Sequence, residues 1–141
     1  MQQRVASDRS VVLALLVMLG GAAALVASFL PWVWVNDPGI PSAGIQQGAG
    51  GVTLVCAGLV LVQGAVAVLR PSIRPLIYTS ALLCAVGIAY VALIVVLNPW
   101  RFLGLDGPCC MLTHAAVQPA AYVTLAGGII AASASLRGAL A

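Results

Sequence analysis

Four apolar runs of about 20 residues dominate the pattern of hydrophobic and polar positions along the chain. They cover residues 10–30, 51–69, 75–97 and 117–136, and none of them contains a charged residue. A helix needs roughly 20 apolar residues to cross the hydrocarbon core of a bilayer. Helix-breaking or charged residues follow each run, where connections between spans belong. The pattern therefore predicts four transmembrane helices joined by short connections.

The apolar runs favour helices over the strands of a membrane β-barrel. Every backbone amide in lipid must be satisfied inside the protein, which leaves only helices and closed barrels. Barrel strands alternate between apolar and polar residues over about ten positions, whereas residues 91–97 are apolar without interruption. We therefore expect an all-α fold, a polytopic four-transmembrane-helix bundle that occupies residues 1–141 as a single domain.

The composition excludes a soluble globular domain. Of the 141 residues, 62% are hydrophobic and 6% are charged, whereas about a quarter are charged in soluble domains. Intrinsic disorder requires low hydrophobicity and high charge, which is the opposite balance. The net charge of +3 is not gathered on one basic face, so nucleic acid is not an expected partner. These numbers leave an integral membrane protein whose first partner is the lipid bilayer.

The positions of the arginines predict the orientation of the chain, because arginine accumulates on the cytoplasmic side. With four spans, three segments share one side: the N-terminus, the connection between the second and third spans, and the C-terminus. Five arginines lie in these segments and one lies on the other side, which places both termini in the cytoplasm. The five are Arg4, Arg9, Arg70, Arg74 and Arg137, and the sixth is Arg101.

A cleaved leader is an alternative interpretation of the first span. Residues 1–28 have a basic start, an apolar stretch and small residues at the end, which are features of a signal peptide. The apolar run of about 20 residues is longer than a usual signal-peptide core. We therefore expect residues 10–30 to be retained as a transmembrane helix.

Three tryptophans, Trp32, Trp34 and Trp100, fall at the expected outer boundary of the membrane. Indole rings prefer this interfacial region, so we expect them to anchor the outer loops there. They are also candidate contacts for a neighbouring protein or lipid, because aromatic residues anchor interfaces. The alternation of Trp and Val over residues 32–35 predicts a short extended segment, and a turn signal follows at residues 36–39.

The second outer loop contains the residues with the most distinctive chemistry. Cys109, Cys110, Met111 and His114 are candidate ligands that suit Cu(I). Thiols there face an oxidising compartment in the expected topology, so Cys109, Cys110 and Cys56 are disulfide candidates whose connectivity stays open. The chain lacks the Cys-x-x-Cys spacing of exchangeable redox pairs. A structural disulfide or free cysteines that only pack are the remaining alternatives, and we expect no cofactor and no metal.

The expected spans carry polar side chains but no charged ones. Charged residues inside a membrane mark proton relays and ion pathways, so the sequence argues against a proton-coupled transporter. It also lacks a nucleophile–base pair and a phosphate-binding loop. The polar side chains contribute interhelical hydrogen bonds of about 0.6 kcal/mol on average. They are Thr53, Gln63, Tyr78, Thr79, Ser80, Tyr90, Gln118, Tyr122 and Thr124.

Small residues recur at four-residue spacing on the fourth span. Gly127 and Gly128 each belong to such a stripe, and stripes of this kind let two helix backbones approach closely. One interpretation is packing inside the bundle of this chain. The alternative is packing against the helices of another membrane protein, which makes both glycines candidate interface residues.

Short motifs near the first two spans resemble a known type of membrane protein. These are Phe-Leu-Pro-Trp-Val at 29–33, Ser-Ala-Gly-Ile at 42–45 and Gly-Ala-Gly-Gly-Val-Thr-Leu-Val at 48–55. Together they resemble small actinobacterial four-helix membrane proteins with a Leu-Pro-Trp end to the first helix, and are similar to tryptophan-operon-associated membrane proteins. The resemblance covers roughly residues 11–97 and does not include the Cys109–Cys110 loop. It implies an architecture and a bacterial host, and it carries over no catalytic residue.

These observations support three functional hypotheses for a multi-pass protein of the bacterial inner membrane. The first is a non-enzymatic accessory or structural subunit that packs against other membrane proteins in a larger complex. The second is a thiol-redox or metal-handling protein of the outer face that uses Cys109 and Cys110. The third is a carrier of a lipid or small molecule, which would need an apolar cavity between the helices.

Overall fold

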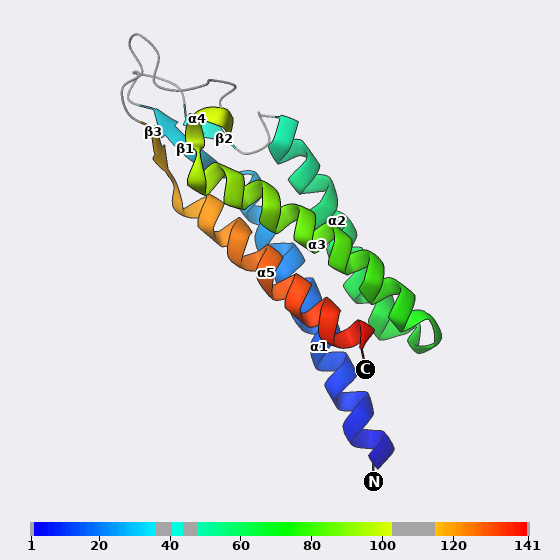
Figure 1. The fold of residues 1–141 in the computed structure, drawn as a ribbon. Helices are drawn as coiled ribbons and strands as arrows, with labels where there is room; N and C mark the ends of the chain where they lie inside the picture. The colour runs from blue at the N-terminus through cyan, green and yellow to red at the C-terminus, as the bar shows by residue number, and fades with distance from the viewer. Residues whose placement is uncertain (1, 36–40, 44–47, 103–114, 141) are drawn as a thin grey trace.

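The computed structural model describes residues 2–35, 41–43, 48–102 and 115–140, and their side chains within residues 10–34, 50–100 and 115–140. Four long helices lie side by side, and a small sheet covers one end of them (Figure 1). Each long helix is apolar enough over at least 18 residues to span a membrane, which indicates a multi-pass membrane protein. The four are α1 (Gln2–Ser28), α2 (Gly48–Leu69), α3 (Arg74–Leu97) and α5 (Pro119–Ala139).

The four helices form a closed ring in cross-section. α1 packs against α2 and α5, α3 packs against the same two helices, and the diagonal pairs barely touch. Both chain ends lie at one end of the bundle, which we call the terminal end, and the sheet lies at the other, which we call the sheet end (Figure 1). The last long helix therefore fills the gap between the first and the third.

Proline sets the beginnings of the helices. α3 and α5 each carry a proline in their first turn, Pro75 and Pro119, where the missing amide proton costs no hydrogen bond. Between α2 and α3 the chain turns through a single 3-10 segment, η2 (Pro71–Ile73). A four-residue helix, α4 (Pro99–Phe102), follows α3 at the sheet end.

The sheet is an addition to the expected all-α fold. Its strands are β1 (Pro31–Val35), β2 (Pro41–Ala43) and β3 (Ala115–Val117), in the antiparallel order β2-β1-β3. The Trp-Val alternation correctly predicts the extended segment that forms β1. Its partner β3 is a three-residue stretch of Ala and Val, which has no alternation of its own. The sequence-based prediction therefore missed the sheet as a whole.

A bulge in β1 decides where the tryptophans point. The pairing of β1 with β2 shifts register between Pro31 and Val33, and such a shift lets two successive side chains face the same side. Trp32 and Val33 are both fully buried, whereas Trp34 is 52% exposed. Trp32 is therefore packed inside the protein and is not an exposed contact for lipid or a neighbouring protein. The bulge turns its ring into the protein.

The interior is built from small residues. Alanine makes up more than half of the buried hydrophobic residues, and valine is the next most common. Cores of this kind hold helix backbones close together without a large apolar side chain between them. A second, smaller cluster lies under the sheet, where Trp32 and Val33 pack with Ala27, Val95 and Ala121.

Candidate functional site

The small-residue stripes of α5 pack inside this chain. A Cβ atom on Gly127 would lie 2.7 Å from the carbonyl oxygen of Gly20 in α1. A Cβ on Gly128 would lie 2.8 Å from the backbone nitrogen of Ala89 in α3. These approaches are too close for any side chain larger than hydrogen. Gly127 and Gly128 therefore join α5 to its two neighbours, and they are not available as an interface with another protein.

Trp32 belongs to the same internal framework. Its Nε1 donates a hydrogen bond to the carbonyl oxygen of Ala27 over 2.8 Å, and its own carbonyl oxygen accepts one from the amide of Gln118 over 2.8 Å. The ring thus ties the end of α1 to β1, and the backbone ties β1 to the start of α5. Trp34 is half exposed and Trp100 is partly exposed, so these two remain candidate anchors.

A polar cluster joins three helices near the terminal end. Arg74 donates one hydrogen bond to the carbonyl oxygen of Ala67 and another to Oγ of Ser10, each over 2.7 Å. The hydroxyl of Tyr78 donates to the carbonyl oxygen of Ser10 over 3.0 Å. The ring of Tyr78 also lies against Gly138, where a Cβ would come within 2.6 Å of it. Arg74 is therefore held inside the protein by its own hydrogen bonds.

Two further polar contacts lie between α2 and α3. Nε2 of Gln63 donates to Oγ of Ser80 over 3.1 Å, and Ser80 in turn donates to the carbonyl oxygen of Ile77 over 2.9 Å. The thiols of Cys56 and Cys84 lie near each other across the same interface. Both polar contacts hold α2 and α3 together.

The cysteine pair differs from the expectation for Cys56. The sequence suggested the outer loop as its partner, whereas the structure places it beside Cys84. Both are free thiols, and the described residues contain no disulfide. The sequence contains one indication of this pairing. A short connection makes α2 and α3 antiparallel neighbours, so residues near the middles of the two helices, such as Cys56 and Cys84, lie at the same level.

The other loop candidates lie outside the described residues. These are Cys109, Cys110, Met111 and His114. Among the residues that the structure does describe, no group of three or more His, Cys, Asp or Glu side chains comes together as a metal site. Comparison of the chain with protein-family models, curated proteins and solved structures finds no match. The resemblance to small actinobacterial membrane proteins therefore remains a prediction.

One helix face stands out on the outside of the bundle. Residues of α3 at alternating spacings of three and four are all exposed along the helix. We call this row the α3 outer face. It contains a tyrosine, Tyr90, which is 64% exposed and whose hydroxyl has no hydrogen-bond partner among the described residues. The other members are Leu76, Thr79, Leu83, Val86, Leu93 and Leu97.

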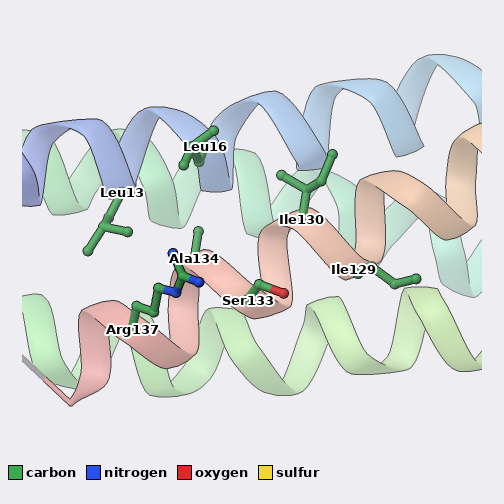
Figure 2. A pocket seen from close by; sticks show the side chains of 7 residues that line it. All are labelled: Leu13, Leu16, Ile129, Ile130, Ser133, Ala134 and Arg137. Atoms are coloured by element: carbon green, nitrogen blue, oxygen red, sulfur yellow. The ribbon is translucent and has the colours of Figure 1, made fainter.

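A groove lies between α1 and α5 near the terminal end (Figure 2). Its volume is about 220 Å³. Four large apolar side chains line it, two from each helix, and Ser133, Ala134 and Arg137 of α5 complete the lining. The Arg137 side chain extends from α5 toward α1 (Figure 2). The four apolar residues are Leu13, Leu16, Ile129 and Ile130.

The geometry offers two surfaces and no reaction centre within the described part of the chain. The α3 outer face is a mostly apolar row with two hydroxyl groups, of which Thr79 donates to the carbonyl oxygen of Pro75 and Tyr90 has no partner among the described residues. The groove is lined by apolar side chains and has a cation at one end. Both can bind hydrocarbon together with a hydrogen-bonding or anionic group. Tyr90 and Arg137 are the residues that distinguish them from an ordinary lipid-facing surface.

Proposed function

We propose that this chain is a non-catalytic accessory subunit of a larger assembly in the bacterial inner membrane, with both termini in the cytoplasm. It docks through the α3 outer face against a transmembrane helix of another protein. No cofactor, metal or nucleic acid takes part in this proposal. The single observation that carries it is the exposed tyrosine in the body of α3.

The depth of Tyr90 makes its exposure unusual. It lies seven residues before Leu97, the end of α3, which is about 10 Å at 1.5 Å per residue. Side chains of a helix tilt toward its N-terminus, and the N-terminus of α3 is at the opposite end of the bundle. The hydroxyl of Tyr90 therefore leans toward the middle of the bilayer and away from the nearer boundary.

A hydroxyl in hydrocarbon lacks the hydrogen bonds that it makes in water, and this loss is costly. A partner helix with an acceptor opposite Tyr90 removes that cost. The surrounding row of apolar side chains repeats every seven residues, as in the seam between two helices of a coiled coil. The exposed face of α2 has the same spacing, so the feature that sets the α3 outer face apart is its polar group, which would fix the register of a partner helix.

The lipid-facing side of α2 offers the contrasting case. Its exposed residues, which include Val52, Val55, Leu59 and Val62, are all apolar. Lipid chains are as apolar as these side chains, so exchanging lipid for a partner helix at this surface gains little free energy. Helix association in a membrane needs a polar contact or small residues that allow close packing. This side of α2 therefore serves as a matched control for the α3 outer face.

Photocrosslinking in native membranes tests the proposal. A photoreactive phenylalanine replaces Tyr90 in one variant and Val55 of α2 in another, and adducts are identified by mass spectrometry. We expect position 90 to capture one protein in defined stoichiometry and position 55 to capture lipid. Only lipid adducts at position 90, together with a monodisperse single chain in mild detergent, would refute the proposal.

A second variant separates the hydroxyl from the ring. Tyr90→Phe keeps the apolar contact area but removes the hydrogen bond, which contributes about 0.6 kcal/mol on average, and it should weaken co-purification by roughly three-fold. Tyr122→Phe is the control, because Tyr122 is also exposed but lies three residues from the start of α5. Adducts with the mass of two copies of this chain would replace the accessory role with self-association.

A further inference from the structure

We infer that the groove between α1 and α5 binds an anionic phospholipid, with Arg137 at its phosphate and one acyl chain along the apolar walls. The inference concerns a different surface from the α3 outer face and does not depend on a protein partner. It also does not depend on which side of the membrane the termini occupy. It rests on the shape of the groove, on the position of Arg137 at one end of it, and on the hydrogen bonding of Arg137 compared with that of Arg74.

The groove extends from the end of α5 into the region of the spans. Arg137 lies in the last turn of α5, and Ile129 lies eight residues before it, which is about 12 Å along the helix. On α1, Leu13 lies three residues into the apolar stretch that begins at Ser10. The cation is therefore at headgroup level while the apolar walls reach inward, as an amphipathic lipid requires.

Arg137 is free to bind a ligand, unlike Arg74. Arg74 donates hydrogen bonds to the carbonyl oxygen of Ala67 and to Oγ of Ser10. Arg137 is exposed, and within the described part of the chain it makes no hydrogen bond and no ion pair. Its guanidinium presents donors in a fork that matches a phosphate, and Ser133 supplies a hydroxyl one turn away in the same lining.

The charge balance of the terminal end favours an anion. In the sequence, five of the six arginines belong to this end and only one of the three aspartates, Asp8, does. Basic pockets between transmembrane helices bind the head groups of anionic lipids through the same complementarity. A soluble anion would use Arg137 but leave the apolar walls unfilled. A transmembrane helix would need a longer contact, since the lining covers about one turn of α1 and two turns of α5.

The physics of the groove predicts what kind of selectivity to expect. Lipid chains are as apolar as leucine, so burying one acyl chain rather than another gains little. The head group supplies the discrimination, since one basic residue contributes about five-fold to association with an anionic lipid surface. The site should therefore select lipids by charge and be nearly indifferent to acyl-chain length.

Native mass spectrometry of the full chain tests this. Protein is reconstituted with equal amounts of phosphatidylglycerol and phosphatidylcholine, and the lipids that survive ejection from the micelle are counted. We expect wild type to retain phosphatidylglycerol about five-fold over phosphatidylcholine. Arg137→Gln should lose this preference. Arg70→Gln, which removes the same charge from an exposed residue outside the groove, should keep it.

A groove-filling variant locates the lipid. Ser133→Trp places a large ring in the groove and leaves Arg137 in place, so it should lower retention of phosphatidylglycerol. Ser133 and Arg137 are both exposed, so neither change disturbs the core, and helicity by circular dichroism confirms the fold. Any of three results would overturn the inference: no headgroup preference in wild type, equal losses in Arg70→Gln and Arg137→Gln, or unchanged retention in Ser133→Trp.

Discussion

Replacing Gly127 with alanine should separate α5 from α1. A Cβ on Gly127 would lie 2.7 Å from the carbonyl oxygen of Gly20, which is about 0.7 Å short of an ordinary contact at 3.4 Å. The obstacle is backbone, so no side-chain rotation relieves it. From the other side, a Cβ on Gly20 would lie 2.5 Å from the carbonyl oxygen of Gly127. The two helices must therefore move apart by a substantial fraction of an ångström.

The size of the effect follows from the packing. A gap of 0.5–1 Å forfeits a quarter to a half of the dispersion energy of the atoms concerned, and overpacked cores lose about 1–3 kcal/mol. We expect Gly127→Ala to lower the free energy of unfolding by this amount. The measurement is equilibrium unfolding in mixed micelles of mild detergent and dodecyl sulfate, followed by far-ultraviolet circular dichroism.

The control is Gly87→Ala in α3. A Cβ at Gly87 has no heavy atom within 4 Å, so the change adds no clash and improves helix propensity by up to about 1 kcal/mol. The stability of Gly87→Ala should equal or exceed that of wild type. If Gly127→Ala unfolds at the same denaturant fraction as Gly87→Ala, the close α1–α5 approach does not hold the bundle together, and the reasoning fails.

Three other predictions follow from the internal contacts. Trp32→Phe removes one of the two hydrogen bonds that the carbonyl oxygen of Ala27 accepts, and the one from the amide of Leu30 remains, so it should cost about 0.5–1.5 kcal/mol of unfolding free energy; Trp34→Phe, at a half-exposed position, should change it by less than about 0.5 kcal/mol. Tyr78→Phe removes the hydrogen bond to Ser10 and should cost about 0.5–1.5 kcal/mol in the same assay, and an unchanged value would show that this bond does not stabilise the protein. Mild oxidation of a variant with serines in place of the two loop cysteines should join Cys56 to Cys84, seen as the loss of two hydrogens in the intact mass; two unmodified thiols after oxidation would contradict their adjacency.

The helices were the easiest part of the fold to predict from the sequence. An apolar run without alternation can satisfy its amides in lipid only as a helix, because the strands of a membrane barrel alternate between apolar and polar residues. Prolines then limit where a helix can begin, as Pro75 and Pro119 do. The positions of the four long helices therefore depend on local properties of the chain.

The contacts between helices depend on properties that are not local. The stripe that contains Gly127 is equally suited to a neighbour within the chain or outside it, and only the ring order of the helices decides between them. The burial of Trp32 depends on a register shift against β2, which no alternation pattern reveals. The groove at Arg137 needs α1 beside α5, and these helices are at opposite ends of the sequence.

The position of Tyr90 could be predicted from the sequence only in part. Its spacing of seven residues from Leu83 and from Leu97 is visible in the sequence and indicates that the three share one face. The sequence does not say whether that face points into the bundle or away from it. Tyr78 shows the difference, because it lies on the same helix and is buried against Gly138.

The pairing of β1 with β3 has a consequence for how the protein is made. Val33 pairs with Val117, so the two strands are joined only after everything between them has been synthesised. Helices emerge from the ribosome in order, N-terminal first, and α5 is the element that fills the space between α1 and α3. Until β3 is synthesised, β1 has one free edge, a feature that promotes pairing with other chains. Completion of the sheet and closure of the ring thus both come late in synthesis, and a chain that stalls before β3 leaves the face of α1 that packs against α5 uncovered.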